Sequence, residues 1–238
     1  MGKILIFGGT TEGRETAMLT ASQGQEVTVC VTSSYARALL PQAMNCHVGV
    51  LDERAMLALM KQQNPSRIID ATHPFATRAT ATIHACAQQL NIPYERMERP
   101  KQDAQSWQDD VQHVADAASA TKALSATDGN VLLTTGSHTI GIYTAAIDPN
   151  RLYVRVLPTI QALELCLSAG VLPSHIIAMH GPFSQELNAA LYDQLDIRVM
   201  VSKDSGAVGG VEEKIIPALA RDIHVILIKR PEEHIHAR

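Results

Sequence analysis

An uninterrupted apolar run followed at once by a glycine pair opens the chain, with residues 3–7 (KILIF) leading into residues 8–13 (GGTTEG). A short continuous apolar run of this kind is typical of a strand buried on both faces, as in a parallel sheet. The residues after Thr11 indicate a helix, because Glu12 and Glu15 are favourable in a first helical turn. The sequence therefore predicts a strand, a glycine turn and a helix at its start.

This glycine turn has the makings of an anion site, because the free N–H groups of a helix N-terminus point at whatever lies there. In the first βα turn of a chain, that anion is usually a nucleotide phosphate. The dinucleotide fingerprint asks for three spaced glycines. Gly8 and Gly13 fit it, whereas Thr10 takes the middle place and offers an N–H and a hydroxyl instead. A tight turn without a ligand is the alternative interpretation. The predicted nucleotide-binding residues of this turn are Gly8, Gly9, Thr10, Thr11 and Glu12.

Strand and helix signals alternate along most of the chain with short connections, which is typical of a doubly wound parallel sheet. Strands are predicted at 4–7, 27–31, 67–70, 93–97, 130–134, 152–156, 175–179, 197–201 and 224–228. Helices are predicted at about 12–22, 52–63, 77–90, 114–126, 160–169, 185–192 and 211–220. The predicted fold class is α/β, with two Rossmann-like parallel-sheet domains.

A polar, proline-bearing stretch at 98–111 interrupts the alternation and marks the predicted domain boundary. Residues 1–98 are predicted to form a dinucleotide-binding domain, and residues 99–238 a substrate-binding domain. The second part has its own glycine-rich turn after a strand, at 202–211. Because ligands of such sheets bind beyond the carboxyl ends of the strands, we expect both turns to line one cleft.

Composition excludes several classes of function. Among 238 residues, 46% are hydrophobic and 18% are charged, as in an ordinary soluble globular protein. A net charge of −4 and 4% aromatic residues leave nucleic-acid binding without support. No run approaches the roughly 20 apolar residues of a membrane span. The apolar run at the N-terminus is also too short for a signal peptide.

The four cysteines are widely scattered and lie in or beside apolar runs, without any Cys-x-x-Cys spacing. We expect buried, reduced thiols, which suit a reducing compartment and hence the cytoplasm. The histidines show no zinc-binding spacing, so no metal site is predicted. The cysteines are Cys30, Cys46, Cys86 and Cys166.

A third informative turn covers residues 70–76 (DATHPFA). Asp70 ends a predicted buried strand, and Pro74 holds the residue before it extended and then begins a helix. The side chains of Thr72 and His73 are thereby presented at the carboxyl edge of the sheet. In the alternative interpretation, Asp70 and Thr72 cap the following helix and His73 bonds to the backbone.

The end of the second predicted strand bears on the choice of nucleotide. An NAD site usually places an acidic residue there, but this chain has Thr32, Ser33, Ser34 and, further on, Arg37. The last three suit a 2′-phosphate and favour NADPH, although loop capping explains the serines equally well. Patterns of short-chain dehydrogenases, P-loop proteins and serine hydrolases are missing from the sequence.

Lys203 lies at the mouth of the second glycine turn, where an ammonium and exposed amides together would hold carboxylates. Further cations are possible helpers at this site, although each alone is more often a solvated surface charge. They are Arg96, Arg99, Lys214 and Arg230.

With these segments in view, the chain resembles the precorrin-6A reductase family of cobalamin biosynthesis, including its cobalt-precorrin-6A form. The resemblance spans nearly the full length, and residues 70–76 and 203–206 (KDSG) are its most specific segments. Further matching segments are 8–12, 94–100, 132–137, 155–158, 181–184, 209–210 and 229–231.

The resemblance implies hydride transfer from NADPH or NADH to a ring carbon of an anionic, polycarboxylated tetrapyrrole. It also implies two Rossmann-like domains and allows a strand to be exchanged between them. Any cobalt would belong to the substrate. Two alternatives remain: a reductase of another small carboxylated substrate, and a non-catalytic module that binds a nucleotide or a tetrapyrrole.

The site residues follow from the turns and the resemblance together. His73 and Lys203 are the candidates for donating a proton or stabilising charge during hydride transfer. Thr32, Ser33 and Thr72 join the first glycine turn in the predicted cofactor site. The predicted substrate-binding residues are Lys203, Ser205, Gly206, Gly209, Gly210, Arg99 and Arg230.

Overall fold

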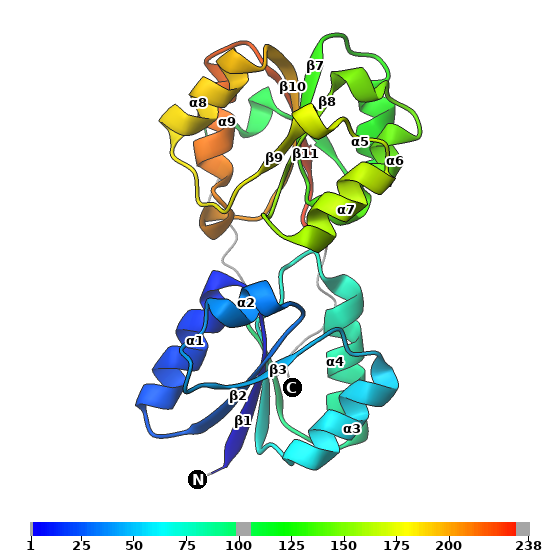
Figure 1. Ribbon diagram of the computed structural model, residues 1–238. Coiled ribbons are helices and arrows are strands. Elements are labelled where there is room, and N and C mark those ends of the chain that lie inside the picture. Colours follow the sequence, from blue (N-terminus) through cyan, green and yellow to red (C-terminus); the bar gives the residue numbers. More distant parts are fainter. Residues whose placement is uncertain (1, 99–105, 232–238) are drawn as a thin grey trace. The chain divides into compact units, whose positions relative to one another are not determined.

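The computed structural model describes residues 2–98 and 106–231 (Figure 1). The chain forms two compact units. Of the described residues, the first unit contains 2–98 and Pro231, and the second contains 106–230. Arg99 lies outside the described residues.

The first unit is a five-stranded, wholly parallel sheet in the order β3-β2-β1-β4-β5. Helices α1 and α2 cover one face of this sheet, and α3 and α4 cover the other (Figure 1). Its strands are β1 (Lys3–Phe7), β2 (Glu26–Val31), β3 (Asn45–Val48), β4 (Arg67–Asp70) and β5 (Tyr94–Arg96), and its helices are α1 (Thr11–Ser22), α2 (Ser34–Ala38), α3 (Glu53–Gln63) and α4 (Thr77–Gln89).

The continuous apolar run of β1 is explained by burial on both faces of the sheet. Ile4 and Ile6 belong to one core cluster, together with residues of α1 and β2. Leu5 and Phe7 point the opposite way, into a second cluster with residues of α3 and α4. Successive strand residues point to opposite faces, so only an unbroken apolar run fills both cores.

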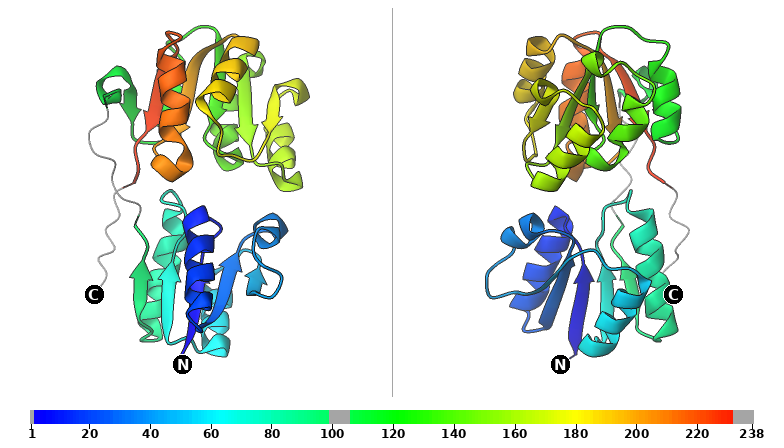
Figure 2. Two further views of the ribbon diagram at one scale, coloured as in Figure 1. Left: turned by 90° about the vertical axis from the view of Figure 1, so that its left-hand side faces the viewer. Right: turned by 45° about the vertical axis from the view of Figure 1, so that its right-hand side comes forward.

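The second unit is a six-stranded parallel sheet in the order β6-β11-β10-β7-β8-β9. Helices α8 and α9 lie on one face, and α5, α6 and α7 on the other (Figures 1 and 2). Its strands are β6 (Gln112–Val114), β7 (Asn130–Thr134), β8 (Leu152–Val156), β9 (Ile176–Ala178), β10 (Ile197–Lys203) and β11 (His224–Ile228), and its helices are α5 (Ala117–Leu124), α6 (Ile140–Thr144), α7 (Ile160–Ser168), α8 (Gln185–Gln194) and α9 (Val211–Leu219). Short 3-10 turns are η1 (Gln108–Asp110), η2 (Ser137–Thr139), η3 (Pro149–Arg151), η4 (Pro173–His175) and η5 (Ala207–Gly209).

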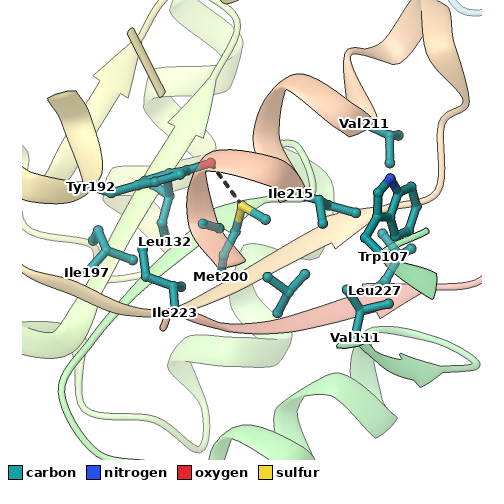
Figure 3. Close-up of a cluster of buried hydrophobic side chains, with 12 residues drawn as sticks. Trp107, Val111, Leu132, Tyr192, Ile197, Met200, Val211, Ile215, Ile223 and Leu227 are labelled. Atoms are coloured by element: carbon teal, nitrogen blue, oxygen red, sulfur yellow. Dashed lines mark hydrogen bonds between the residues drawn. The ribbon is translucent and has the colours of Figure 1, made fainter. Parts of the chain in front are cut away.

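A cluster of buried side chains joins α8 and α9 to the second sheet (Figure 3). The Tyr192 hydroxyl donates to Met200 Sδ over 3.2 Å and lies 2.9 Å from the carbonyl oxygen of Lys214. Burial raises the pKa of the Tyr192 phenol, so this hydroxyl stays protonated and fixes the distance between the two helices and the sheet.

The predicted α/β class with two parallel-sheet domains is confirmed. Four short elements, β3, β6, α2 and α6, were not predicted, because each is too short for a clear periodicity. The helix predicted from Val114 begins at Ala117, since Gln112–Val114 pair with β11 instead. Each described sheet takes its strands from one half of the chain, so an exchanged strand is not found among them.

The four cysteines are free, as predicted; three are buried and Cys46 is half-buried, which corrects its predicted burial. Within residues 2–98 and 106–231, no helix is both long and apolar enough to cross a membrane.

Candidate functional site

The strand order places one topological switch point in each sheet. In the first unit the chain leaves β1 toward β2 and leaves β4 toward β5, on opposite sides. Open α/β sheets bind ligands in the crevice beyond the carboxyl ends of two such strands. The loops that follow β1 and β4 are the predicted glycine turn and the segment 71–76.

Two glycines let helix α1 pack closely against these loops. A Cβ atom on Gly8 would lie 3.3 Å from the Cα of Gly13 and 3.4 Å from the Cβ of Ala71. Gly9 differs, because it is exposed and the nearest atom to an added Cβ is 3.7 Å away, on Ala36. Gly8 and Gly13 thus serve packing, whereas a Cβ on the exposed Gly9 would make only an ordinary contact.

Thr10 uses its hydroxyl within the protein. Its Oγ1 accepts a hydrogen bond from the N–H of Gly13 over 3.0 Å and donates to the carbonyl of Ala71 over 2.9 Å. The expected use of this hydroxyl for a phosphate is therefore corrected. In the described part of the chain, the N–H groups of Gly9, Thr10 and Thr11 have no acceptor, so three amide donors remain for an anion.

A buried ion pair holds the loop after β4. Asp70 is fully buried, and its Oδ1 lies 3.1 Å from Arg96 Nη1. The same Oδ1 accepts from the N–H of Thr72 over 3.0 Å, and Oδ2 accepts from the Tyr94 hydroxyl over 2.8 Å. Arg96 Nη1 also donates to the carbonyl of Thr72 over 3.0 Å.

The alternative interpretation of Asp70 and Thr72 as helix caps is wrong, because α4 begins after Ala76 without any side-chain cap. Thr72 instead shares a hydrogen bond of 3.0 Å with the hydroxyl of Thr80. Arg96, expected as a solvated charge or a substrate contact, is 8% exposed and structural.

His73 is half-buried and held by its own turn. Its Nδ1 accepts from the N–H of Phe75 over 3.2 Å, as the backbone-bonded alternative expected. An accepting Nδ1 places the proton of the neutral imidazole on Nε2, which is the atom that can donate.

The loop after β2 contains two groups expected near the ribose. Ser33 caps α2, since its hydroxyl accepts from the N–H of Ala36 over 3.2 Å. Arg37 donates to the carbonyl groups of Leu40, Pro41 and Gln42 at 3.3, 3.1 and 2.9 Å. The two side chains therefore have structural partners, whereas Thr32 and Ser34 are exposed.

The switch point of the second sheet lies between β10 and β7, and brings together several predicted substrate-binding residues. Lys203 ends β10 half-buried, and burial lowers the pKa of its ammonium. Ser205 is buried. Gly206 adopts φ 74°, and a Cβ there would lie 2.9 Å from Arg230 Nη2, so the guanidinium rests against this glycine.

Two amides expected to bind carboxylates have partners within this turn. The N–H of Gly209 donates to the carbonyl of Gly206 over 2.9 Å, and that of Gly210 to Ala207 over 2.8 Å. These two hydrogen bonds shape the turn, and the binding of a carboxylate by Gly209 or Gly210 stays a prediction. Over the described ranges, no three His, Cys, Asp or Glu side chains gather as metal ligands.

Sequence reasoning missed the buried cation Arg155 of the second unit. Arg155 on β8 is 7% exposed, donates to Asn188 Oδ1 over 2.7 Å and stacks on the Phe183 ring with its Cζ 4.3 Å from the centroid. Lys214, predicted only as a possible helper, is 8% exposed. The sequence signal that could have revealed this group is a single arginine inside an otherwise apolar strand, 152–156.

The fold and the switch-point loops define an α/β enzyme of the doubly wound type with two Rossmann-like units. The chain belongs to the precorrin-6x reductase CbiJ/CobK family, whose model matches residues 3–238. The predicted family and the oxidoreductase class are thereby confirmed.

Known proteins of this family are similar over nearly the whole chain. A cobalt-precorrin-6A reductase of Priestia megaterium is 34% identical over 96% of this chain and 91% of its own length. A precorrin-6A reductase of Rhodobacter capsulatus is 32% identical over 97% of this chain and 89% of its own length. A solved structure of CobK precorrin-6A reductase covers 99% of this chain and 91% of its own, with a TM-score of 0.80 and 27% identity.

Proposed function

We propose that this protein reduces one C=C bond of precorrin-6A or its cobalt complex, with NADPH or NADH as hydride donor. The observation that carries the proposal is the family match over residues 3–238 together with relatives named for this activity. The reaction takes one hydride from the nicotinamide to a ring carbon and one proton from a donor, and leaves the oxidised nucleotide. The product is (cobalt-)precorrin-6B, in cobalamin biosynthesis.

The first unit is the proposed nucleotide site. The free amides of Gly9, Thr10 and Thr11 fit a pyrophosphate, and the exposed Gly9 has no side chain to keep it from the backbone. Thr32 and Ser33 lie at the end of β2, where such sheets hold the ribose. The bound nucleotide supplies the hydride, and the residues of this unit hold it in position.

His73 and Lys203 are the proposed proton-handling and charge-stabilising residues. Hydride addition places electron density on a conjugated ring nitrogen, which a nearby donor relieves. His73 Nε2 carries the proton of the neutral ring, since Nδ1 is an acceptor. Lys203, with Ser205, Gly206 and Arg230, is proposed to face the acidic substrate. The prediction that both glycine turns line one cleft stays a prediction.

The decisive experiment incubates the protein with precorrin-6A or cobalt-precorrin-6A and with NADPH or NADH, and follows the nicotinamide absorbance. Consumption of the reduced nucleotide with one macrocycle supports the proposal. No turnover with any of the four combinations contradicts it. Nucleotide oxidation by smaller carboxylated substrates alone indicates the other reductase, and tetrapyrrole binding without turnover indicates a carrier.

A pair of glycine variants tests the nucleotide site. Gly9→Val places a branched side chain where the pyrophosphate is proposed to lie, so the Kd for NADPH should rise by at least tenfold. Gly141→Val is the matched control, because Gly141 lies in the second unit and an added Cβ there meets no atom within 4 Å. Equal affinity of the two variants would contradict the placement.

A further inference from the structure

The second unit contains two buried cations at the same edge of its sheet. Arg155 lies one residue from the carboxyl end of β8, and Lys214 lies in the first turns of α9. They are 7% and 8% exposed. Buried charges in proteins are normally paired, because an isolated buried charge is costly.

Lys214 has no such pair. Within residues 2–98 and 106–231, its Nζ has no hydrogen-bond or ion-pair partner. Nor is Nζ among the unbonded atoms that are sealed from solvent, so it keeps a small opening to water. Arg155 donates from Nη1 to Asn188. In the same described ranges its Nε and Nη2 have no acceptor, and both atoms keep some access to solvent.

The start of helix α9 adds positive potential at this place. Gly210 precedes the helix in the left-handed region, at φ 63°, and no side chain caps the helix. An uncapped helix N-terminus carries about half a positive charge. Lys214 is the fourth residue of α9, and Cβ atoms of a helix tilt toward its N-terminus, so the Lys214 side chain starts out toward this positive end.

The carboxylate nearby does not neutralise the cluster. Glu213 Oε2 would lie 3.5 Å from a Cβ on Gly210 and is buried without a hydrogen-bond partner, yet it forms no ion pair with Lys214. Asn188 fixes the geometry, since its Nδ2 donates to the carbonyl of Glu213 over 2.9 Å while its Oδ1 holds Arg155. Glu212 is the other acidic residue of this first turn, but Glu213 is the carboxylate that acts on Lys214. Two cations and a helix end outweigh that carboxylate, which leaves a positive potential around Lys214.

We propose that Arg155, Lys214 and the N-terminal amides of α9 form a subsite for one carboxylate of the acidic substrate. This inference rests on the proposed function, because that function supplies the polycarboxylated ligand. A planar guanidinium, an ammonium and helix amides form charge-assisted hydrogen bonds with a carboxylate. Such a carboxylate would supply the missing partner of Lys214.

The charges around Lys214 indicate what binding would do to its proton. Arg155 from β8 and Glu213 from its own helix are the charges that act on it, and Tyr192 from α8 stays neutral beside them. Burial first, and the Arg155 charge second, lower the pKa of the Lys214 ammonium to about 7. A bound carboxylate reverses this effect, so substrate binding above that pH should draw a proton from solvent.

Calorimetry without nicotinamide tests the subsite. The wild type is titrated with precorrin-6A at about pH 8 in buffers of different ionisation enthalpy, which gives the protons taken up per bound macrocycle. Wild type should take up close to one, and Lys214→Met close to none. In turnover assays, Lys214→Met should raise KM for the macrocycle roughly 10- to 100-fold, with kcat and the Kd for NADPH nearly unchanged. Lys214→Arg should restore most of the affinity.

Lys122→Met is the matched control, because Lys122 is an exposed lysine on α5 of the same unit. It should behave as wild type. Circular dichroism establishes that the Lys214 variants are folded. A folded Lys214→Met protein with unchanged proton uptake and unchanged KM would overturn the subsite while wild-type turnover upholds the proposed function. A wild type that neither binds nor reduces either macrocycle contradicts the proposed function, and the subsite falls with it.

Discussion

The hydroxyl of Thr10 donates a hydrogen bond of 2.9 Å to the carbonyl of Ala71, and this bond joins the two loops of the first switch point. The same oxygen accepts from the N–H of Gly13 and caps α1. A glycine at the middle place of the fingerprint could form neither bond. Thr10, in the place of the middle glycine, thus stabilises the turn through its side chain, while the backbone amides of the turn stay free.

Thr10→Val tests the hydrogen bonds of the Thr10 hydroxyl, because valine keeps the branched shape of the side chain and removes only the hydroxyl. Loss of the cap should lower the free energy of unfolding by about 1 kcal/mol. Loosening of the loops should raise the Kd for NADPH severalfold. Urea denaturation and fluorescence titration measure the two effects. Thr82→Val is the control, since the Thr82 hydroxyl of α4 donates to the carbonyl of Arg78 in the same helix and lies outside the proposed nucleotide site; equal behaviour of the two variants would contradict the assigned role.

Asp70 and Arg96 form a buried ion pair in the first unit, and Asp70→Asn removes the carboxylate charge beside the guanidinium. We expect a loss of about 3–5 kcal/mol of stability, because a buried cation then loses the carboxylate that pairs with it. Urea denaturation monitored by circular dichroism measures this loss.

The exposed pair of Arg67 and Glu95 provides the comparison on neighbouring strands. Its N–O distance of 3.2 Å is similar, but the side chains are 45% and 52% exposed. Glu95→Gln should therefore cost no more than about 1 kcal/mol. A similar cost for both variants would show that burial does not set the strength of the Asp70 pair.

The sequence predicted most of the fold because buried parallel strands and amphipathic helices leave strong local patterns, as in residues 3–7. It missed strands such as Asn45–Val48, whose half-exposed residues carry little pattern. The candidate site was predictable as far as glycines and strand ends reveal it. The partners of Asp70, Thr10 and Arg37 depend on neighbours distant in the chain or on loop carbonyls. Such contacts cannot be predicted from the residue types alone.

Arg37 illustrates this limit and leads to a prediction on cofactor choice. Its three hydrogen bonds go to loop carbonyls, so Arg37→Met should leave the ratio of NADPH to NADH affinity within about twofold of the wild type. Loss of those bonds should cost about 1–2 kcal/mol of stability. Parallel titrations with both nucleotides measure the ratio. A selective tenfold loss of NADPH affinity would instead show that Arg37 binds the 2′-phosphate.

Lys214 should make the stability of the protein depend on pH. Its ordinary pKa of 10.5 applies to the unfolded chain, whereas burial lowers the pKa in the folded protein to about 7. Between these values the unfolded chain binds a proton that the folded protein lacks. The free energy of unfolding therefore rises with pH above about 7, by up to about 1.4 kcal/mol per pH unit. Below that pH both states are protonated and this contribution is constant.

The pH range in which the Lys214 effect can be measured ends near 9.0, the ordinary pKa of a thiol. Burial raises the pKa of Cys30 from 9.0 to about 12, so at higher pH the unfolded thiol loses a proton that the folded one keeps, and stability falls. Urea denaturation between about pH 7 and 8.5 avoids this opposing effect. Lys214→Met should remove the rise, since all other titrating groups are common to both proteins. If the free energy of unfolding has the same pH slope in the wild type and the variant, the prediction is contradicted. The pKa of Lys214 in the folded protein would then lie above about pH 8.5, because a lysine that is charged in both the folded and the unfolded state contributes no slope.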